Sequence, residues 1–194
     1  MVNGMYSYLS KAWKKPSRDM LRDRLIEWRA GNSLVVIDKP TRIDRARTLG
    51  YKDKKGFVIV RSRVRRGGRK REMKNMKGRK TRKQTNRKTL KMSYQWIAEI
   101  RAARKFKNLE VLNSYNLAKD GKYYFYEVIM VDPSRPEIKK DISLRWISSG
   151  KNSKRAERGL TSAARKSRGL NSRSGKSPEL KVRPSLRAWN RQGK

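Results

Sequence analysis

Arginine, lysine and glycine dominate one internal stretch of the sequence, RVRRGGRKREMKNMKGRKTRKQTNRK at residues 63–88, and the chemistry open to them is phosphate binding. Guanidinium groups donate paired hydrogen bonds to phosphate oxygens, and glycines let a backbone approach closely. The stretch holds one acid, Glu72, and little that a core could bury. Blocks of like charge are often solvated tails, but this one is internal, between a predicted strand and a predicted helix. We therefore predict that it contacts nucleic acid.

Two groups of carboxylates are candidates for a metal site or for acid–base chemistry. One group is Asp19 with Asp23, and the other is Asp132 with Glu137 and Asp141. The first group lies among arginines on a predicted helix, where surface ion pairs explain it. The second group lies beside lysines in a proline-containing loop. Neither has a constrained frame that would hold a catalytic geometry.

Histidine and cysteine are both absent from the chain. Their absence excludes Ser-His-Asp triads, zinc fingers and disulfide frameworks. The tripeptide GKS at residues 175–177 resembles the end of a phosphate-binding P-loop, but Leu170 stands where that pattern requires glycine. We predict that the chain is not an enzyme and takes no small-molecule substrate, no cofactor and no resident metal.

The charge balance points to a polyanionic partner. The 194 residues include 54 Lys and Arg against 16 Asp and Glu, a net charge of +38, and only 35% are hydrophobic. A polyanion relieves the self-repulsion of such a chain and releases counterions as it binds. We find no signal-peptide core, no membrane-spanning run of about 18 apolar residues and no long one-sided amphipathic helix. We therefore expect an intracellular protein that does not bind membranes.

The N-terminal third predicts two helices and a strand. Residues 5–30 have helical character in two pieces separated at Pro16, and Ser17 is the expected N-cap of the second piece. The run LVVID at residues 34–38 predicts a short buried strand.

A short helix and a second strand follow. TRID at residues 41–44 resembles a capping box with Asp in place of Glu, and Gly50 suits the position just after the helix. GFVIVRSRV at residues 56–64 predicts a strand. One face of that strand begins buried and ends as a row of guanidinium groups, in the order Phe57, Ile59, Arg61, Arg63 and Arg65.

The second half predicts a helix followed by a hairpin. Apolar residues at helical spacing over residues 93–106, with a serine N-cap at position 93, predict the helix. Residues 110–117 and 123–131 predict two strands joined by an Asp-Gly turn. The last strand is apolar or aromatic on both faces, so we expect it in the middle of the sheet or under a helix.

These elements predict an α+β fold with a small, mostly antiparallel sheet and three basic appendages. The region from residue 145 to 194 has two acids, Glu157 and Glu179, and we expect an extended basic tail with one short helix at residues 160–168. The predicted organisation is an N-terminal helical extension at 1–33, a core at 34–131 that contains the basic loop 65–92, and a C-terminal tail at 132–194.

Aromatic residues give two open alternatives. YYFY at residues 123–126 could form a base-stacking platform, but the apolar residues that follow it favour a place in the core. Trp13, Trp146 and Trp189 lie beside basic residues outside the predicted sheet. Stacking on RNA and docking on the domain explain these three tryptophans equally well.

Three segments together resemble one known family. They are LGYKDKKGFVIVRSRVRRGGRKR at 49–71, VLNSYNLAKDGKYYFYEVIMVDPSRPEI at 111–138 and RGLTSAARKSRGL at 158–170. They resemble the archaeal and eukaryotic large-subunit ribosomal protein family called fifteen-e, over a span from about Tyr6 to about residue 170. The chain is shorter than the eukaryotic members and lacks their histidine-rich tail, which favours an archaeal source.

The resemblance implies a four-stranded antiparallel sheet with extensions that run into large-subunit rRNA. It implies no catalytic activity and no cofactor, although structural Mg²⁺ shared with the rRNA is compatible with it. It also implies neighbouring large-subunit proteins as partners, no homo-oligomer, and a cytoplasmic, ribosome-bound location. With the charge pattern, it gives these predicted RNA contacts: Arg61, Arg63, Arg65, Arg66, Gly67, Gly68, Arg69, Lys70, Arg71, Lys74, Lys77, Arg79, Lys80, Arg82, Lys83, Arg87, Lys88, Arg155, Arg158, Arg165, Lys166 and Arg168.

Two other functional classes remain to be separated by experiment. A DNA-compacting chromatin protein would have the same charge, although a compact basic face or a groove-entering helix is more typical of that class. A basic nuclease would show metal-dependent RNA cleavage that depends on a particular carboxylate.

Overall fold

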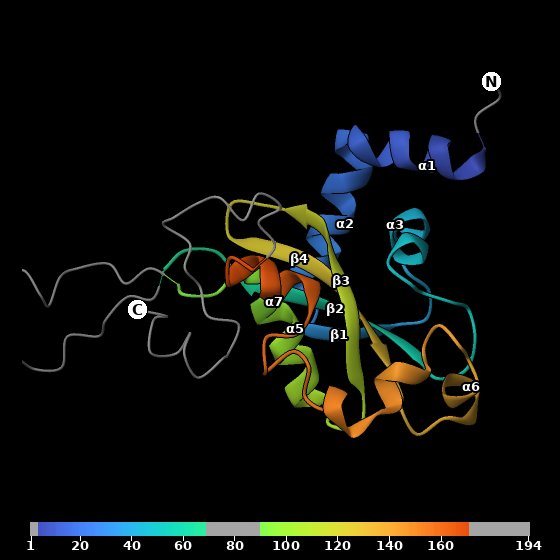
Figure 1. Cartoon of the computed structure of the whole chain (residues 1–194). Coiled ribbons are helices and arrows are strands. Elements are labelled where there is room, and N and C mark those ends of the chain that lie inside the picture. Colours follow the sequence, from blue (N-terminus) through green and yellow to red (C-terminus); the bar gives the residue numbers. More distant parts are fainter. Residues whose placement is uncertain (1–3, 69–89, 171–194) are drawn as a thin grey trace, which may run out of the picture.

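Four strands form one antiparallel sheet in the order β1-β2-β4-β3 (Figure 1) in the computed structural model, which describes residues 4–68 and 90–170. The strands are β1 (Leu34–Ile37), β2 (Phe57–Arg65), β3 (Glu110–Lys119) and β4 (Tyr123–Val131). The strand with apolar residues on both faces, β4, lies inside the sheet as predicted. The α+β fold class is confirmed.

Helices cover both faces of this sheet. One face carries α2 (Arg18–Ala30) and α3 (Ile43–Thr48), and α1 (Met5–Lys14) lies against α3 beyond the sheet (Figure 1). The other face carries α5 (Tyr94–Lys105), which contacts α7 (Ser162–Ser167). The connection from β4 to α7 contains three short turns of helix: α6 (Pro136–Lys139), η1 (Arg145–Ser148) and η2 (Gly150–Asn152).

The alternation of β4 builds a core on each side of the sheet. Val128 and Met130 pack toward α5, whereas Phe125 and Ile129 pack toward α2 and α3, and all four are completely buried. Successive side chains of a strand point to opposite faces. A strand between two helical layers therefore has to be apolar on both faces.

Three of the predicted helix boundaries are confirmed. The chain breaks between α1 and α2 at Pro16, the side chain of Ser93 caps α5 by accepting a hydrogen bond from the backbone N–H of Trp96, and Gly50 has a left-handed φ of 98° just after α3. Ser17 occupies the N-cap position of α2, but its side chain makes no capping hydrogen bond.

The predicted capping box at residues 41–44 is wrong. The N-cap of α3 is Arg42, and no side chain caps the helix. Thr41 instead donates hydrogen bonds from its hydroxyl and its backbone N–H to the carboxylate of Glu127 on β4. The carboxylate of Glu127 is buried, and burying a carboxylate without hydrogen-bond donors is costly, which favours the use of Thr41 at this position.

Residues 145–170 are also not extended, contrary to the prediction. Ile147, Ala156 and Ala164 have at most 1% of their surface exposed, and this segment forms η1, η2 and α7 against the domain. Its apolar residues are few, but Ile147 packs with Val131 and Ile138, and Ala156 packs in the core cluster that contains α5. The short helix predicted at 160–168 is confirmed as α7. No helix within the described residues is long and apolar enough to cross a membrane.

Candidate nucleic-acid interface

The predicted row of arginines on β2 is only partly available to a partner. Arg61 has its guanidinium carbon 5.1 Å from the Trp28 ring centroid and a nitrogen 3.8 Å from a Glu27 oxygen. Burial lowers the pKa of Arg61. Arg63 lies over the ring of Tyr123 at 4.8 Å and donates to the carbonyl of Arg29. These two arginines hold α2 to the sheet, whereas Arg65 is exposed.

The chain is pinned where β2 ends. The backbone N–H of Arg66 donates to the carbonyl of Lys122 at 2.8 Å. The guanidinium carbon of Arg66 lies 5.2 Å from the Tyr124 ring centroid. The next N–H, of Gly67, donates to the hydroxyl of Tyr94 at 2.8 Å. Gly67 has a φ of 100°, a left-handed conformation that side chains with a Cβ rarely adopt. The start of the basic loop is therefore fixed to the β3–β4 turn and to α5.

The end of the basic loop and the end of α7 meet at the same place. The backbone N–H of Ser93, just before α5, donates to the Ser167 hydroxyl at 2.9 Å. Residues 68, 90 and 170 thus lie at one corner of the domain, at the left of the sheet in Figure 1. We call this surface the basic corner, defined by six exposed side chains: Arg65, Arg66, Lys91, Lys122, Arg165 and Lys166.

Two members of the basic corner were missed by sequence reasoning. Lys122 belongs to a tight hairpin turn outside any basic run, whereas Lys91 lies at the end of the predicted basic loop 65–92 but was not among the predicted contacts. The only signal that could have found Lys122 is strand pairing. Arg65 pairs with Tyr123 across β2 and β4, which puts Lys122 beside the exit of the loop.

The aromatic run at residues 123–126 belongs to the domain rather than to an open stacking platform. Phe125 and Tyr126 are buried, and burial raises the pKa of Tyr126 to about 12. Tyr124 stacks between Tyr94, at 5.0 Å between ring centroids, and Tyr126, at 6.1 Å. Because the guanidinium of Arg66 also lies over the ring of Tyr124, the stacked rings of Tyr94, Tyr124 and Tyr126 pack against this side chain of the basic corner.

A buried carboxylate fastens the C-terminal segment to the helix α5. Glu99 is fully buried and accepts hydrogen bonds of 2.5 Å from the hydroxyls of Ser114 on β3 and Thr161 before α7. Its burial raises the pKa of Glu99 to about 7. The indole N–H of Trp96 adds a bond of 2.7 Å to the carbonyl of Ala156. The segment that carries Arg165 and Lys166 is therefore fixed by α5.

The other predicted contacts near the C-terminus differ in exposure. Arg168 is 3% exposed and donates to the carbonyl of Gly159 at 2.9 Å. Arg155 is half-buried, lies 4.4 Å from the Trp146 ring centroid and donates to the carbonyl of Val111. Arg158 is exposed and donates to the carbonyl of Lys151. Arg168 and Arg155 therefore use their guanidinium groups for contacts within the domain, which hold the C-terminal segment in place.

Of the remaining predicted contacts, Gly68 is exposed at the basic corner. The following predicted contacts lie outside the described residues: Arg69, Lys70, Arg71, Lys74, Lys77, Arg79, Lys80, Arg82, Lys83, Arg87 and Lys88.

Tryptophans 13 and 146 dock on the domain. The ring of Trp13 lies between the guanidinium carbons of Arg24 and Arg42, at 5.5 and 5.2 Å. Trp146 is 40% exposed, stacks under Arg155 and donates from its indole to the carbonyl of Ser143. Trp189 lies outside the described residues.

Two of the candidate catalytic carboxylates, Asp141 and Asp132, are engaged in ion pairs. Asp141 accepts from the ammonium groups of Lys52 and Lys54 at 2.7 and 2.5 Å, and these contacts hold the pKa of Asp141 well below its usual range. Asp132 pairs with Arg135 at 3.5 Å. Within residues 4–68 and 90–170, no three acids are grouped so as to hold a metal ion.

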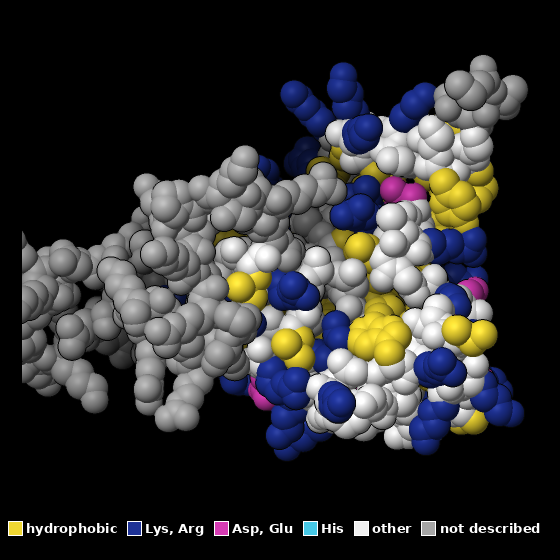
Figure 2. Space-filling view, in the orientation of Figure 1, with side chains coloured by type: hydrophobic (Ala, Val, Ile, Leu, Met, Phe, Trp, Pro, Cys, Tyr) yellow, Lys and Arg dark blue, Asp and Glu magenta, His cyan; other side chains and the backbone are white. Residues whose placement is uncertain are grey.

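Figure 2 shows Lys and Arg side chains along the upper edge over α1 and along the lower edge of the described surface, with few acids between them.

Comparison with known proteins places the chain among ribosomal proteins. A family model described as Ribosomal L15 matches residues 4–189. The chain is 50% identical over 199 residues to the large ribosomal subunit protein eL15 of Methanocella arvoryzae, with 100% of both chains covered. It is 51% identical to the eL15 protein of Methanospirillum hungatei, with 97% of each chain covered, and 52% identical to that of Thermoplasma volcanium, with 96% of each covered.

Proposed function

This chain belongs to the L15e family of structural, non-enzymatic proteins of the large ribosomal subunit, and we propose that it stabilises large-subunit rRNA through its basic corner. The two basic segments that leave this corner, residues 69–89 and 171–194, extend the contact. Its location is then the cytoplasmic ribosome. Its partners are the rRNA and neighbouring large-subunit proteins, and it works as a single copy without a cofactor of its own. Mg²⁺ ions near it are those of the rRNA.

The convergence of the chain at the basic corner carries this proposal. Two bonds, from Gly67 to Tyr94 and from Ser93 to Ser167, bring the end of β2, the start of α5 and the end of α7 to one place. Charge that is spread over a surface binds a polyanion loosely, whereas charge fixed at one site selects a particular arrangement of phosphates. Arginine fits that task because its planar fork contacts two oxygens at once.

A matched pair of double variants tests the corner. Arg165→Gln with Lys166→Gln removes two positive charges from α7 at the corner. Lys139→Gln with Lys140→Gln removes two exposed charges from α6, at the opposite end of the domain in Figure 1. We expect the α7 variant to bind large-subunit rRNA more weakly than the α6 variant. The measurements are the fraction of each protein in purified large subunits and its affinity for the isolated rRNA at several salt concentrations.

Equal losses in the two variants would contradict the corner and leave only a diffuse charge effect. Circular dichroism of both purified proteins controls for unfolding of α7. Sedimentation of the native protein with chromosomal DNA rather than with large subunits would instead favour the chromatin alternative.

A further inference from the structure

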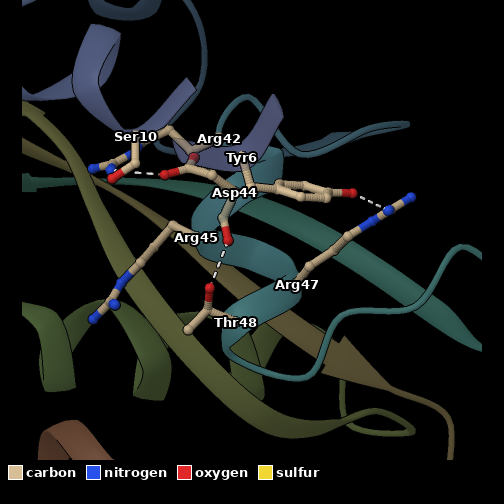
Figure 3. Close-up of a pocket in the computed structure, with 7 residues that line it drawn as sticks. All are labelled: Tyr6, Ser10, Arg42, Asp44, Arg45, Arg47 and Thr48. Atoms are coloured by element: carbon tan, nitrogen blue, oxygen red, sulfur yellow. Dashed lines mark hydrogen bonds and ion pairs between the residues drawn. The ribbon is translucent and has the colours of Figure 1, made fainter. Parts of the chain in front are cut away.

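A polar pocket between α1 and α3 lies away from the basic corner. It encloses about 460 Å³. Tyr6 and Ser10 of α1 form one wall (Figure 3). The opposite wall and the floor come from α3 and the residue before it: Arg42, Asp44, Arg45, Arg47 and Thr48. A volume in this range accommodates a small organic ligand.

The floor of the pocket is a buried acid with unused hydrogen-bonding capacity. Asp44 is 9% exposed, and one of its oxygens lies 3.4 Å from a nitrogen of Arg42. Its other carboxylate oxygen, Oδ1, has no hydrogen-bond partner within the described part of the chain, and neither has Nε of Arg42. Asp44 lines the pocket, and buried polar groups are normally satisfied, so a hydrogen-bond donor is the ligand group that suits this floor.

The rim of the pocket is aromatic and cationic. Tyr6 is 38% exposed, its hydroxyl accepts a hydrogen bond from Arg47, and the guanidinium carbon of Arg47 lies 5.6 Å from its ring centroid. Arg45 and Arg47 are exposed and extend to opposite sides of α3, with Asp44 between them (Figure 3). Two phosphates of one strand could therefore be contacted on either side of the acid.

These groups distinguish a nucleotide from a bare anion. Binding of a free phosphate beside Asp44 is unfavourable, because both groups are negatively charged and repel each other. A nucleotide satisfies all three features: its phosphates meet Arg45 and Arg47, its base stacks on the exposed ring of Tyr6, and an amino or hydroxyl donor meets Asp44.

We propose that this pocket holds a single unstacked nucleotide of RNA, as a contact separate from the basic corner. The inference rests on the proposed function, since a ribosomal chain meets RNA on several sides. Its ligand is a base extruded from a helix or loop, with a hydrogen-bond donor on its base edge or ribose directed to the acid.

The test uses ribosomes that contain the full chain. Large subunits are purified with wild-type protein, Tyr6→Ala, Tyr6→Phe or Tyr8→Ala. Tyr8 is a matched control, because it is 58% exposed on the same helix but does not line the pocket. Chemical probing of the rRNA reads base accessibility, and ultraviolet crosslinking with mass spectrometry identifies the partner of Tyr6.

We expect Tyr6→Ala to expose one particular nucleotide roughly tenfold more than wild type, which is a typical loss for one base–aromatic stack. Tyr6→Phe should retain that protection, because it keeps the ring, and Tyr8→Ala should leave it unchanged. Tyr6 itself should crosslink to that nucleotide.

Two results would overturn the inference. One is the same probing pattern in Tyr6→Ala and Tyr8→Ala, and the other is a crosslink from Tyr6 to a peptide, which would assign the pocket to a neighbouring protein. Failure of the wild-type chain to enter large subunits would be a different outcome, since it would refute the proposed function.

Discussion

Glu99 gives the sharpest quantitative prediction, because it joins the C-terminal segment to the rest of the domain through one carboxyl group. Its burial raises the pKa of Glu99 from 4.5 to about 7. The folded domain therefore favours the protonated acid. The resulting stability is fully present below pH 4.5 and is lost as the pH rises through 7. At about 1.36 kcal/mol for each pH unit between the two pKa values, the contribution amounts to about 3 kcal/mol.

Glu99→Gln is the corresponding perturbation, since an amide remains uncharged at every pH. Its oxygen can accept from one of the two hydroxyls, of Ser114 or Thr161, and its amino group can donate to the other. Between pH 4.5 and pH 8, wild type should lose the free energy of unfolding that Glu99 contributes, whereas the variant should not. We therefore expect the decrease over this pH range to be about 3 kcal/mol smaller in the variant than in wild type.

Urea unfolding of the purified protein, followed by tryptophan fluorescence at steps of pH, measures this difference. Glu127 is also buried with a raised pKa, so the wild-type curve contains its contribution in the same direction. Subtracting the two curves removes it. Glu157→Gln is the control, because Glu157 lies on the same segment but pairs at the surface with Arg104 at 2.9 Å. Parallel curves for wild type and Glu99→Gln would refute the reasoning.

Three further predictions follow from other parts of the domain. Arg165→Gln with Lys166→Gln should reduce the slope of log affinity for rRNA against log salt by about 1.5, since each lost phosphate contact removes about 0.7 to 0.9; an unchanged slope in a salt titration would contradict contact by these residues. Gly67→Val should destabilise the free domain by about 1–2 kcal/mol in urea unfolding, because its φ of 100° opposes a Cβ, whereas wild-type stability would show that the backbone relaxes there. Asp141→Asn should remove stability that wild type has above pH 4 and loses on acidification, because contacts with two lysines lower the pKa of Asp141; an acid-unfolding curve identical to wild type would exclude that role.

The apolar patterns predicted where the strands lie, because successive side chains of a strand point to opposite faces. Residues 123–131 were predicted in the middle of the sheet or under a helix, and β4 lies in the middle. The strand β1 was predicted to be buried, but it is an edge strand in which Val36 is 50% exposed. The Asp-Gly turn fixed the hairpin that joins β3 to β4. Its Asp120 accepts hydrogen bonds from the backbone N–H groups of Lys122 and Tyr123, which is the local chemistry that makes such a turn predictable.

Long-range polar contacts could not be predicted, because they leave no local pattern. Nothing in its neighbourhood distinguishes Glu99, which is buried in α5, from Glu157, which pairs at the surface. Thr41 has a suitable position for a cap and instead reaches a carboxylate 86 residues away. The apolar residues at 147, 156 and 164 are likewise too sparse to form a local pattern, so the sequence predicted an extended tail. Only the folded domain shows that these residues are buried.

The placement of the acids bears on how a chain with a net charge of +38 forms a stable interior. Some of its carboxylates accept from backbone or hydroxyl donors, whereas others, among them Asp141, Asp132 and Glu157, pair with lysine or arginine. Glu127 accepts from Thr41 and Tyr115, and Glu110 accepts from the backbone N–H groups of residues 154 and 155. An acid committed to backbone or hydroxyl donors contributes to folding without neutralising an arginine that faces a phosphate. Other acids are exposed: Asp19, Asp23 and Glu27 lie among arginines on α2, and Asp38 and Asp53 lie in loops. Because each of these carboxylates would repel a phosphate, we expect RNA to avoid them and to favour the basic corner, whose six defining side chains are all cationic.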